Sequence, residues 1–417
     1  MIRILKHREA RELLARRVAR LAEAERVVGP ILEDVRRRGD AAVVAHARRL
    51  DGLGDRPLEV SRREMVQACE DAGASFFSAL DCAYRNIRRF AERQVPAEFW
   101  MKFPDGHRAG QIVRPLDSVA AYVPGGRHPL PSTLLMTVVP AQVAGVRAIA
   151  AASPKPAREV LATAHFLRLQ RFFRIGGAQA IAAFAFGTQT VPRADRIVGP
   201  GNIYVAAAKK LLAGEVAIDF IAGPTEIVIL AAEGDPRLLA ADLLAQAEHD
   251  EDAAAILLTT SRPLARAVAA EIERQLETLP TAAAARRAIE RNSAIVLVRS
   301  LEQALEFANE YAPEHLSIPD RSLLGGVRNA GSVFIGPASP EAAGDYASGP
   351  NHVLPTSGHA RVRGGLSAAD FVKVISVQEL NPSALRRLAP AITTLARAEG
   401  LEAHARSVEV RLDERKR

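Results

Sequence analysis

The stretch LLAQAEHDED places Gln246 and His249 three residues apart at the end of an apolar helical pattern. Three residues are close to one turn of helix, so the two side chains lie near each other on one face. An amide and an imidazole at the buried end of a helix can bind a metal ion, or they can simply hydrogen-bond within the core. A zinc site needs about four ligands. This pair alone therefore does not decide between the two roles.

Further candidate ligands occur in two other stretches. GDYASGPNHVLPTSG puts Asp345, Asn351 and His352 in a predicted glycine-rich loop after the strand-like SVFIG, where α/β proteins often carry functional residues. RAEGLEAHARSV carries Glu399 and His404, whose spacing by itself indicates only an exposed helical pair. An ordinary polar loop, with Asp345 as a turn residue, explains the first stretch equally well.

YAPEHLSI brings two titratable side chains together, Glu314 and His315. Adjacent residues on one element do not share a face, so we do not expect a simple hydrogen-bonded dyad. Two neighbouring bases at the start of an element can nevertheless serve successive proton transfers in one pocket. As a dipeptide Glu-His is common, and the pattern alone does not establish catalysis.

The helix that would position Gln246 has clear signals. Asp235 is a good N-cap and Pro236 suits the first helical position, so we expect a helix from there to about residue 249. Leu239, Leu243 and Gln246 then share one face. Gln246 is therefore expected to point inward.

Short β-prone runs alternate with helical runs from about residue 118 to 230, which predicts a doubly wound α/β domain with a mainly parallel sheet. Three strand-to-helix turns carry glycine, at 123–126, 175–177 and 198–202. Strand ends of such a sheet lie together, so these turns would line one crevice suited to a nucleotide. Each glycine can also serve its turn alone, and GxGxxG is absent.

A second α/β region brackets the first. Helical patterns at 8–46 and 62–93 precede the first region, and strand and helix patterns resume after 230. Past about residue 361 the pattern becomes helical and ends in a strand-like VEVRL. The expected divisions are an N-terminal helical arm (1–20), a discontinuous first α/β domain (21–121 plus 227–361), a second α/β domain with the crevice (122–226) and a small C-terminal domain (362–417).

Composition excludes several classes of protein. The 417 residues are 48% hydrophobic, enough for two or more domains with full cores. The net charge is +7, but basic and acidic residues alternate along helical stretches, which is typical of solvated faces and not of nucleic-acid binding. No apolar run approaches the roughly 18 residues of a membrane span. With no signal-peptide core and only Cys69 and Cys82, the expected location is the cytoplasm.

A longer series of motifs carries a resemblance. YVPGG, RIGGAQAIAAFAFGT, RIVGPGNIYVAAAKKLL, AGPTE, DLLAQAEHD, YAPEHL, GDYASGPNHVLPT and EGLEAHARSVEVR occur in the order, and nearly the spacing, of histidinol dehydrogenases. The chain resembles that family over almost its whole length. The resemblance implies two Rossmann-like doubly wound parallel-sheet domains without the GxGxxG fingerprint. It also implies a zinc-dependent, NAD-linked oxidation of L-histidinol to L-histidine through L-histidinal, in histidine biosynthesis.

The resemblance also assigns roles to residues. Positions that bind zinc in the family match Gln246, His249, Asp345 and His404, the last from the partner in an intertwined homodimer. The substrate-contacting positions match those four ligands together with Thr225, His315 and Glu399. The NAD-binding positions match three residues at or beside the glycine turns: Tyr122, Gln179 and Asn202.

In the family's chemistry the residue matching His315 takes the alcohol proton, and the residue matching Glu314 activates water for the aldehyde step. Two alternatives remain open. One is a paralogous zinc and NAD dehydrogenase of another polar alcohol, such as a sulfonated diol, although the retained Glu399 and His404 argue against it. The other is a zinc hydrolase that uses Glu314 as base, which leaves the glycine turns unexplained.

Overall fold

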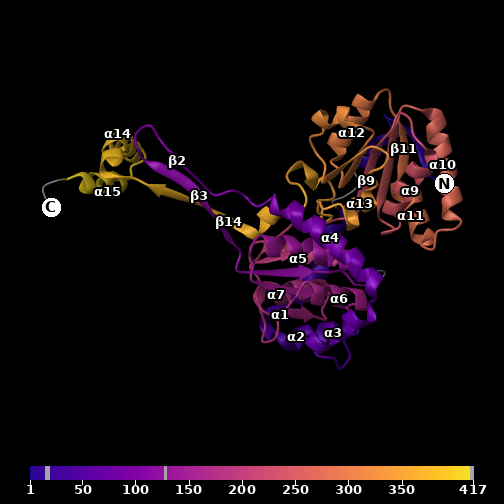
Figure 1. The fold of residues 1–417 in the computed structure, drawn as a ribbon, viewed down its shortest axis with the longest axis horizontal. Coiled ribbons are helices and arrows are strands. Elements are labelled where there is room, and N and C mark those ends of the chain that lie inside the picture. The colour runs from indigo at the N-terminus through magenta and orange to yellow at the C-terminus, as the bar shows by residue number, and fades with distance from the viewer. Residues whose placement is uncertain (15–18, 126–128, 414–417) are drawn as a thin grey trace. The chain divides into compact units, whose positions relative to one another are not determined.

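The computed structural model describes residues 1–14, 19–125 and 129–413 and divides the chain into two compact units. The large unit comprises Met1–Gln94 with Asp117–Phe371, and the small unit comprises Val95–Leu116 with Val372–Arg417. Figure 1 labels the main helices and strands of both units. Among the helices of the described ranges, none combines the length and apolar character needed to cross a membrane.

The large unit contains a six-stranded parallel sheet in the order β1-β11-β10-β9-β12-β13. Its strands are β1 (Arg3–Lys6), β9 (Glu226–Leu230), β10 (Ala254–Thr259), β11 (Ala294–Leu297), β12 (His315–Ile318) and β13 (Ser332–Ile335). Most are apolar runs because strands of a parallel sheet are buried on both faces.

Successive side chains of this sheet point to opposite faces and build two cores. Ile227 and Ile229 enter one core, and Val228 and Leu230 enter the other. The first core is completed by α9 (Pro236–Ala247), α10 (Arg262–Leu276) and α11 (Ala282–Asn292). The second is completed by α12 (Leu301–Tyr311) and the 3-10 helices η1 (Ala10–Leu14) and η3 (Arg321–Gly326).

The second sheet of the large unit has five parallel strands in the order β6-β5-β4-β7-β8. They are β4 (Ser118–Tyr122), β5 (Ala148–Ala152), β6 (Arg171–Phe173), β7 (Arg196–Val198) and β8 (Ala217–Ile218). One face shares a core with α1 (Ala19–Arg38), α2 (Asp40–His46), the π-helical turn η2 (Ala47–Asp51), α7 (Gly177–Phe186) and α8 (Ile203–Leu212).

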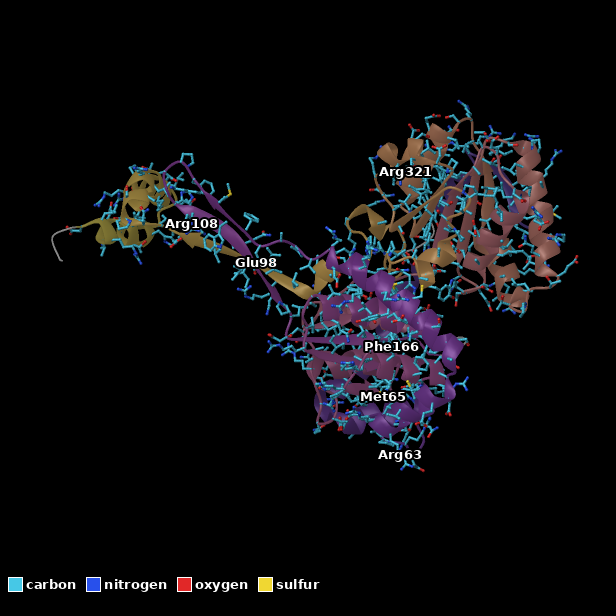
Figure 2. All side chains as sticks on the ribbon, in the orientation of Figure 1. Arg63, Met65, Glu98, Arg108, Phe166 and Arg321 are labelled. Atoms are coloured by element: carbon cyan, nitrogen blue, oxygen red, sulfur yellow. The ribbon has the colours of Figure 1, made fainter. Side chains whose placement is uncertain are left out.

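The opposite face is covered by α5 (Pro131–Val143) and α6 (Arg158–Phe166), which connect β4 to β5 and β5 to β6. α3 (Arg62–Asp71) packs on α6, and α4 (Ala74–Glu92) packs on α5. Met65 of α3 and Phe166 of α6 belong to this layer (Figure 2). The predicted alternation of strands and helices over this region, and the predicted doubly wound α/β class, are confirmed.

The predicted allocation of N-terminal residues differs from the observed packing. The range 21–121 was expected to join 227–361, but α1 to α4 pack around the five-stranded sheet instead. The expected helical arm (1–20) contains strand β1, which pairs with β11 of the six-stranded sheet. A four-residue strand is too short to show a decisive period, and no local signal says which of two sheets an amphipathic helix will cover.

The small unit is an antiparallel sheet in the order β14-β3-β2 with two helices, α14 (Pro382–Ala398) and α15 (Glu402–Leu412). β3 (Arg108–Pro115) pairs with both β2 (Phe99–Lys102) and β14 (Val372–Glu379). Glu98 and Arg108, labelled in Figure 2, form ion pairs with Arg114 and Glu379.

Two predictions for this end of the chain are wrong. The small unit begins at residue 372, not 362, and it includes residues 95–116, which supply two of its three strands. VEVRL is helical, within α15, and not a strand. Its alternating valines imitate a strand pattern, but Ala405 and Val408 are buried three residues apart, which is the helical spacing.

Candidate active site

Gln246 lies where the helix signals predicted. Asp235 caps α9 by accepting a hydrogen bond from the amide N–H of Arg237, and Pro236 occupies the first turn. Gln246 is 1% exposed and continues the buried face formed by Leu243. His249 follows the C-cap residue, just past the helix, and its side chain is 44% exposed.

A chain of hydrogen bonds runs from Gln246 to Glu314. The Gln246 Nε2 group donates to Thr225 Oγ1, and the Thr225 hydroxyl donates to Glu314 Oε2 at 2.5 Å. The backbone N–H of Glu226 donates to the same carboxylate oxygen at 2.9 Å. Thr225 and Glu314 each precede a strand, and the parallel pairing of His315 with Ile227 sets them side by side. Sheet register therefore brings together residues that are 89 positions apart.

His315 is the first residue of β12 and is 3% exposed. Its Nδ1 lies 3.2 Å from the carbonyl oxygen of Glu226. A carbonyl can only accept, so Nδ1 carries the proton in the neutral ring and Nε2 presents its lone pair. Nε2 is buried without a hydrogen-bond partner and lies 3.6 Å from Asp345 Oδ1. His315 thus has one ring nitrogen that no other protein group binds, and this nitrogen is the proton acceptor of the neutral ring.

Glu314 and His315 do share one pocket, although they are adjacent in the chain. The Glu314 Oε2 and His315 Nδ1 atoms are 3.7 Å apart, longer than a hydrogen bond. Only His315 belongs to the strand, so the alternation of faces does not apply to the pair. The arrangement matches two bases in one site and not a bonded dyad.

Asp345 was expected in a loop, but it lies in the short helix α13 (Glu341–Tyr346). The surrounding GDYASG reads as a turn because its glycine and serine are poor helix formers, yet Glu341 supplies an acidic first turn after Pro340. Asp345 Oδ2 lies 4.0 Å from His249 Nε2.

The two neighbouring polar candidates support the backbone around this site. His352 Nδ1 donates to the backbone oxygen of Asp345 at 2.7 Å, and its Nε2 lies 3.3 Å from Thr133 Oγ1. The Asn351 side chain donates to the backbone oxygen of Met136. Both of His352's nitrogens are therefore occupied by the protein, which is a structural role.

Burial and charge shift the acid–base groups. Burial raises the pKa of Glu314 to about 7, against the opposing effects of His315 and of the Thr225 hydroxyl. Burial lowers the pKa of His315, but the carboxylates of Glu314, Asp345 and Glu341 outweigh it and raise that pKa to about 9. Burial also opposes ionisation of Asp345, yet His315 holds the pKa of that carboxyl below its usual value.

One buried acid of the site was missed in the sequence. Glu341 lies one helical turn before Asp345 on α13 and is 3% exposed. Neither carboxylate oxygen of Glu341 has a hydrogen-bond partner, and burial raises its pKa well above the usual value. The four-residue spacing between Glu341 and Asp345 could have indicated this acid, because residues four apart on a helix share a face. Glu341 adds a third carboxyl beside His315, after Glu314 and Asp345.

The donors present suit zinc, which takes nitrogen and oxygen ligands. Gln246 Nε2 is used by Thr225, so its amide oxygen remains as the donor atom. Within the described ranges, no group of three or more His, Cys, Asp or Glu side chains is close enough to hold a metal. His249 and Asp345 are two such donors, and Gln246 adds an amide. The predicted fourth ligand, His404, is an exposed residue of α15 in the small unit, and Glu399 is the exposed C-cap of α14.

A separate cavity of about 510 Å³ is lined by Tyr122, Gln179 and Asn202. These residues lie at the carboxyl ends of three strands of the five-stranded sheet: Tyr122 ends β4, Gln179 lies in the first turn of α7 after β6, and Asn202 caps α8 after β7. Gly125 and Gly177 line the same space, whereas Gly126 of the first predicted turn lies outside the described residues. The structure therefore brings the three glycine turns to one crevice.

The hydroxyl of Tyr122 accepts the backbone N–H of Gly177, and burial raises the pKa of this phenol to about 12. The side chain of Asn202 accepts the N–H groups of Tyr204 and Val205 at the start of α8. Both residues are thus fixed by the turns that they face. A cavity of this volume is within the usual range for small-molecule and cofactor sites.

Comparison with known proteins agrees over nearly the whole chain. The family model described as histidinol dehydrogenase matches residues 14–412. The chain belongs to the histidinol dehydrogenase family. It is 51% identical over 393 residues to the histidinol dehydrogenase of Thermus thermophilus, covering 93% of this chain and 94% of that protein. It is 49% identical over 401 residues to that of Geobacillus kaustophilus, covering 94% of each.

A solved histidinol dehydrogenase from Elizabethkingia anophelis superposes with a TM-score of 0.94 at 35% identity, covering 99% of this chain and 98% of that one. Membership of the histidinol dehydrogenase family confirms the predicted family, the predicted oxidoreductase class and the assignment to histidine biosynthesis. The roles of individual residues are argued below from the geometry of the site.

Proposed function

We propose that this member of the family oxidises L-histidinol to L-histidine in two NAD-linked steps, through L-histidinal that stays on the enzyme. The observation that carries the proposal is the buried pair Glu314 and His315, with one free imidazole nitrogen beside Asp345. Two successive oxidations need a base for each hydride transfer and a base for hydration of the aldehyde. The pair supplies both kinds of base in one pocket.

In the first step, His315 Nε2 takes the hydroxyl proton of the alcohol while a hydride leaves the same carbon for NAD. The aldehyde and NADH result. The Nδ1 contact to the Glu226 carbonyl holds the ring in the required tautomer. Thr225 and Glu399 would contact the substrate, together with His315 and the four metal ligands.

In the second step, Glu314 removes a proton from water as the water adds to the aldehyde carbon. As the water adds, the His315 imidazolium returns the proton taken in the first step to the aldehyde oxygen, so the ring is a base again. The hydrate then loses one hydroxyl proton to His315 and a hydride to a second NAD, which gives the carboxylic acid, and this acid ionises to the carboxylate. Glu314 suits this role because Thr225 and the Glu226 N–H hold its carboxylate in place. Its pKa of about 7 makes it a base near neutral pH.

Gln246, His249 and Asp345 would hold zinc, with His404 from a second copy of the chain. Zinc supplies, when bound, a cation that anchors the amine and imidazole of the substrate. Tyr122, Gln179 and Asn202 would hold NAD in the separate cavity, and their position at the strand ends of a doubly wound sheet supports this.

The proposal includes a homodimer with shared active sites, in the cytoplasm, with neither nucleic acid nor membrane as partner. The small unit supports it, because few of its apolar side chains are buried and many are exposed. The exposed set comprises Phe99, Trp100, Met101, Val374, Ile375, Leu380, Leu395, Leu401 and Val410. A second copy of the chain would cover such a surface.

The first test is NADH production from L-histidinol and NAD, before and after chelation of zinc. Two NADH per histidinol, lost on chelation and restored by zinc, is the expected result. No turnover with histidinol but turnover with another polar alcohol, such as a sulfonated diol, would identify that alcohol as the substrate. Zinc-dependent hydrolysis without NAD binding would indicate a hydrolase and contradict the proposed oxidation.

Subunit mixing tests the shared site. His404→Ala subunits are expected to be inactive alone, and Glu314→Ala subunits are expected to stop at the aldehyde, so neither alone should form histidine. Heterodimers of the two should regain part of the activity, because one of their two sites has both intact residues. Confirmed heterodimers without activity would contradict the shared-site proposal.

A further inference from the structure

The cofactor cavity contains a buried acid that no role above uses. Asp51 ends the π-helical turn η2, is 7% exposed and lines the cavity beside Gln179. One of its oxygens, Oδ2, accepts two hydrogen bonds of 2.9 Å, from the backbone N–H of Gly176 and from Gln179 Nε2. Gly176 is the N-cap of α7, so Asp51 ties η2 to the start of that helix.

This contact determines which way the Gln179 amide faces. The Asp51 oxygen that accepts the Gly176 N–H also accepts from Gln179, so the amide nitrogen of Gln179 faces Asp51. The amide oxygen, Oε1, then points away from Asp51. It is buried and has no hydrogen-bond partner, in a side chain that is 1% exposed.

Gly177 leaves room for this orientation. A Cβ at Gly177 would lie 3.1 Å from Gln179 Oε1, and its φ of +56° is one that glycine adopts readily. A buried acceptor without a donor is costly, and it is most often explained by a missing water or ligand. Because Gln179 lines a cavity of cofactor size, the donor can come from the ligand.

We propose that Asp51 is a positioning residue that orients the Gln179 amide, so that Oε1 accepts a hydrogen bond from a hydroxyl or amine of the dinucleotide. This inference rests on the proposed NAD site and deepens it. In this proposal Asp51 acts on the cofactor through Gln179. The hydrogen bond from Nε2 to Asp51 also polarises the amide, which strengthens Oε1 as an acceptor.

The test is a double-mutant cycle on the full chain with Asp51→Leu, Gln179→Leu and the double variant. Asp51→Leu frees the amide to turn its nitrogen toward the cavity, and should raise KM for NAD about tenfold, the effect of one lost hydrogen bond. KM for histidinol and kcat should stay near the wild-type values. The double variant should match Gln179→Leu, because Asp51 acts only through Gln179.

Two further variants separate positioning from general damage. Asp51→Asn can place its amide oxygen where Oδ2 lies and should recover most of the loss seen in Asp51→Leu. Asp40→Leu is the matched control, because Asp40 ties the N-terminal helices to Thr188 and Thr190 without lining the cavity. It should lower the unfolding temperature and leave KM for NAD unchanged.

Cofactor analogues identify the donor. NADP lacks the free ribose 2′-hydroxyl, and the hypoxanthine analogue of NAD lacks the adenine amine. Gln179→Leu should raise KM about tenfold for NAD and for the analogue that keeps the donor. It should not raise KM for the analogue that lacks the donor. Equal losses for both analogues would place the donor on another hydroxyl or amine of the dinucleotide, whereas additive effects of Asp51→Leu and Gln179→Leu would overturn the inference.

The outcome is separable from that of the proposed function. If the wild-type enzyme makes no NADH from histidinol, direct titration of NAD by calorimetry still compares Asp51→Leu with Gln179→Leu. Wild-type NAD binding that neither variant weakens would refute the positioning role. In that case the assignment of the cavity to NAD would rest on Tyr122 and Asn202 alone.

Discussion

Removing the hydroxyl of Thr225 should shift the pH dependence of aldehyde oxidation. This hydroxyl donates to Glu314 Oε2 at 2.5 Å, and it lowers the pKa of the carboxyl while burial raises it to about 7. Thr225→Val keeps the shape of the side chain and deletes the donor. Glu314 then retains only the backbone N–H of Glu226 as a donor among these contacts.

The magnitude follows from the charge of the acceptor. A hydrogen bond to a charged group contributes about 1.5–3 kcal/mol, which corresponds to about one to two pKa units. The pKa of Glu314 should therefore rise from about 7 to about 8 or 9. Glu314 acts as a base only when ionised, so activity is lost as pH falls through its pKa. At pH 7 the ionised fraction should fall from about one half to between about a tenth and a hundredth.

The assay is oxidation of supplied L-histidinal with NAD between pH 6 and pH 10. His315, whose pKa is raised to about 9, sets the upper break of the acidic limb of kcat/KM. In Thr225→Val the lower break, which Glu314 sets, should move toward alkaline pH by one to two units, and Thr225→Ser, which keeps the hydroxyl, should not shift it. A constant loss at every pH is also expected, because Gln246 Nε2 loses its acceptor. A lower break that stays in place in Thr225→Val would refute the argument that this hydroxyl tunes Glu314.

Three other predictions concern catalysis and stability. His315→Ala should slow both half-reactions by about 10²- to 10⁴-fold, whereas Glu314→Gln should slow aldehyde oxidation and spare alcohol oxidation, as measured with histidinol and histidinal separately. Lys209→Met leaves Asp219 buried without the 2.6 Å ion pair and should lower the free energy of unfolding by about 3–5 kcal/mol; a loss under about 1 kcal/mol in urea unfolding would contradict this. Burial raises the pKa of Asp242 to about 6, so the folded state favours its neutral form, and the stability present below about pH 4 is lost as pH rises through 6. Asp242→Asn should therefore be about 1–2 kcal/mol more stable than wild type at pH 8 and equal to it at pH 4.

Much of the α/β architecture could be predicted because its signals are local. Apolar runs such as EIVIL and the N-cap at Asp235 depend on residues within one or two turns. The helix that carries Gln246, the inward direction of that side chain, and the strands that end at the cavity beside Gln179 followed from such patterns. The family followed from the order of many motifs.

Long-range packing could not be predicted in the same way. Helices α1 to α4 cover the five-stranded sheet, and β1 joins the six-stranded one. These positions depend on which apolar faces pack together in the folded chain. β3 and β14 pair although they are more than 250 positions apart, as Arg108 and Glu379 show. A pattern within one segment carries no information about its distant partner.

The sequence by itself determined the types of most elements of the α/β region and the candidates for chemistry, because backbone preferences and hydrophobic periodicity act over a few neighbouring residues. Only the tertiary structure decided which groups are buried together. It placed Glu341 as an unpaired acid beside His315, and it paired Asp51 with Gln179 across 128 positions. Burial sets the free energy of a charge and of an unpaired polar atom, and burial exists only after distant segments have packed.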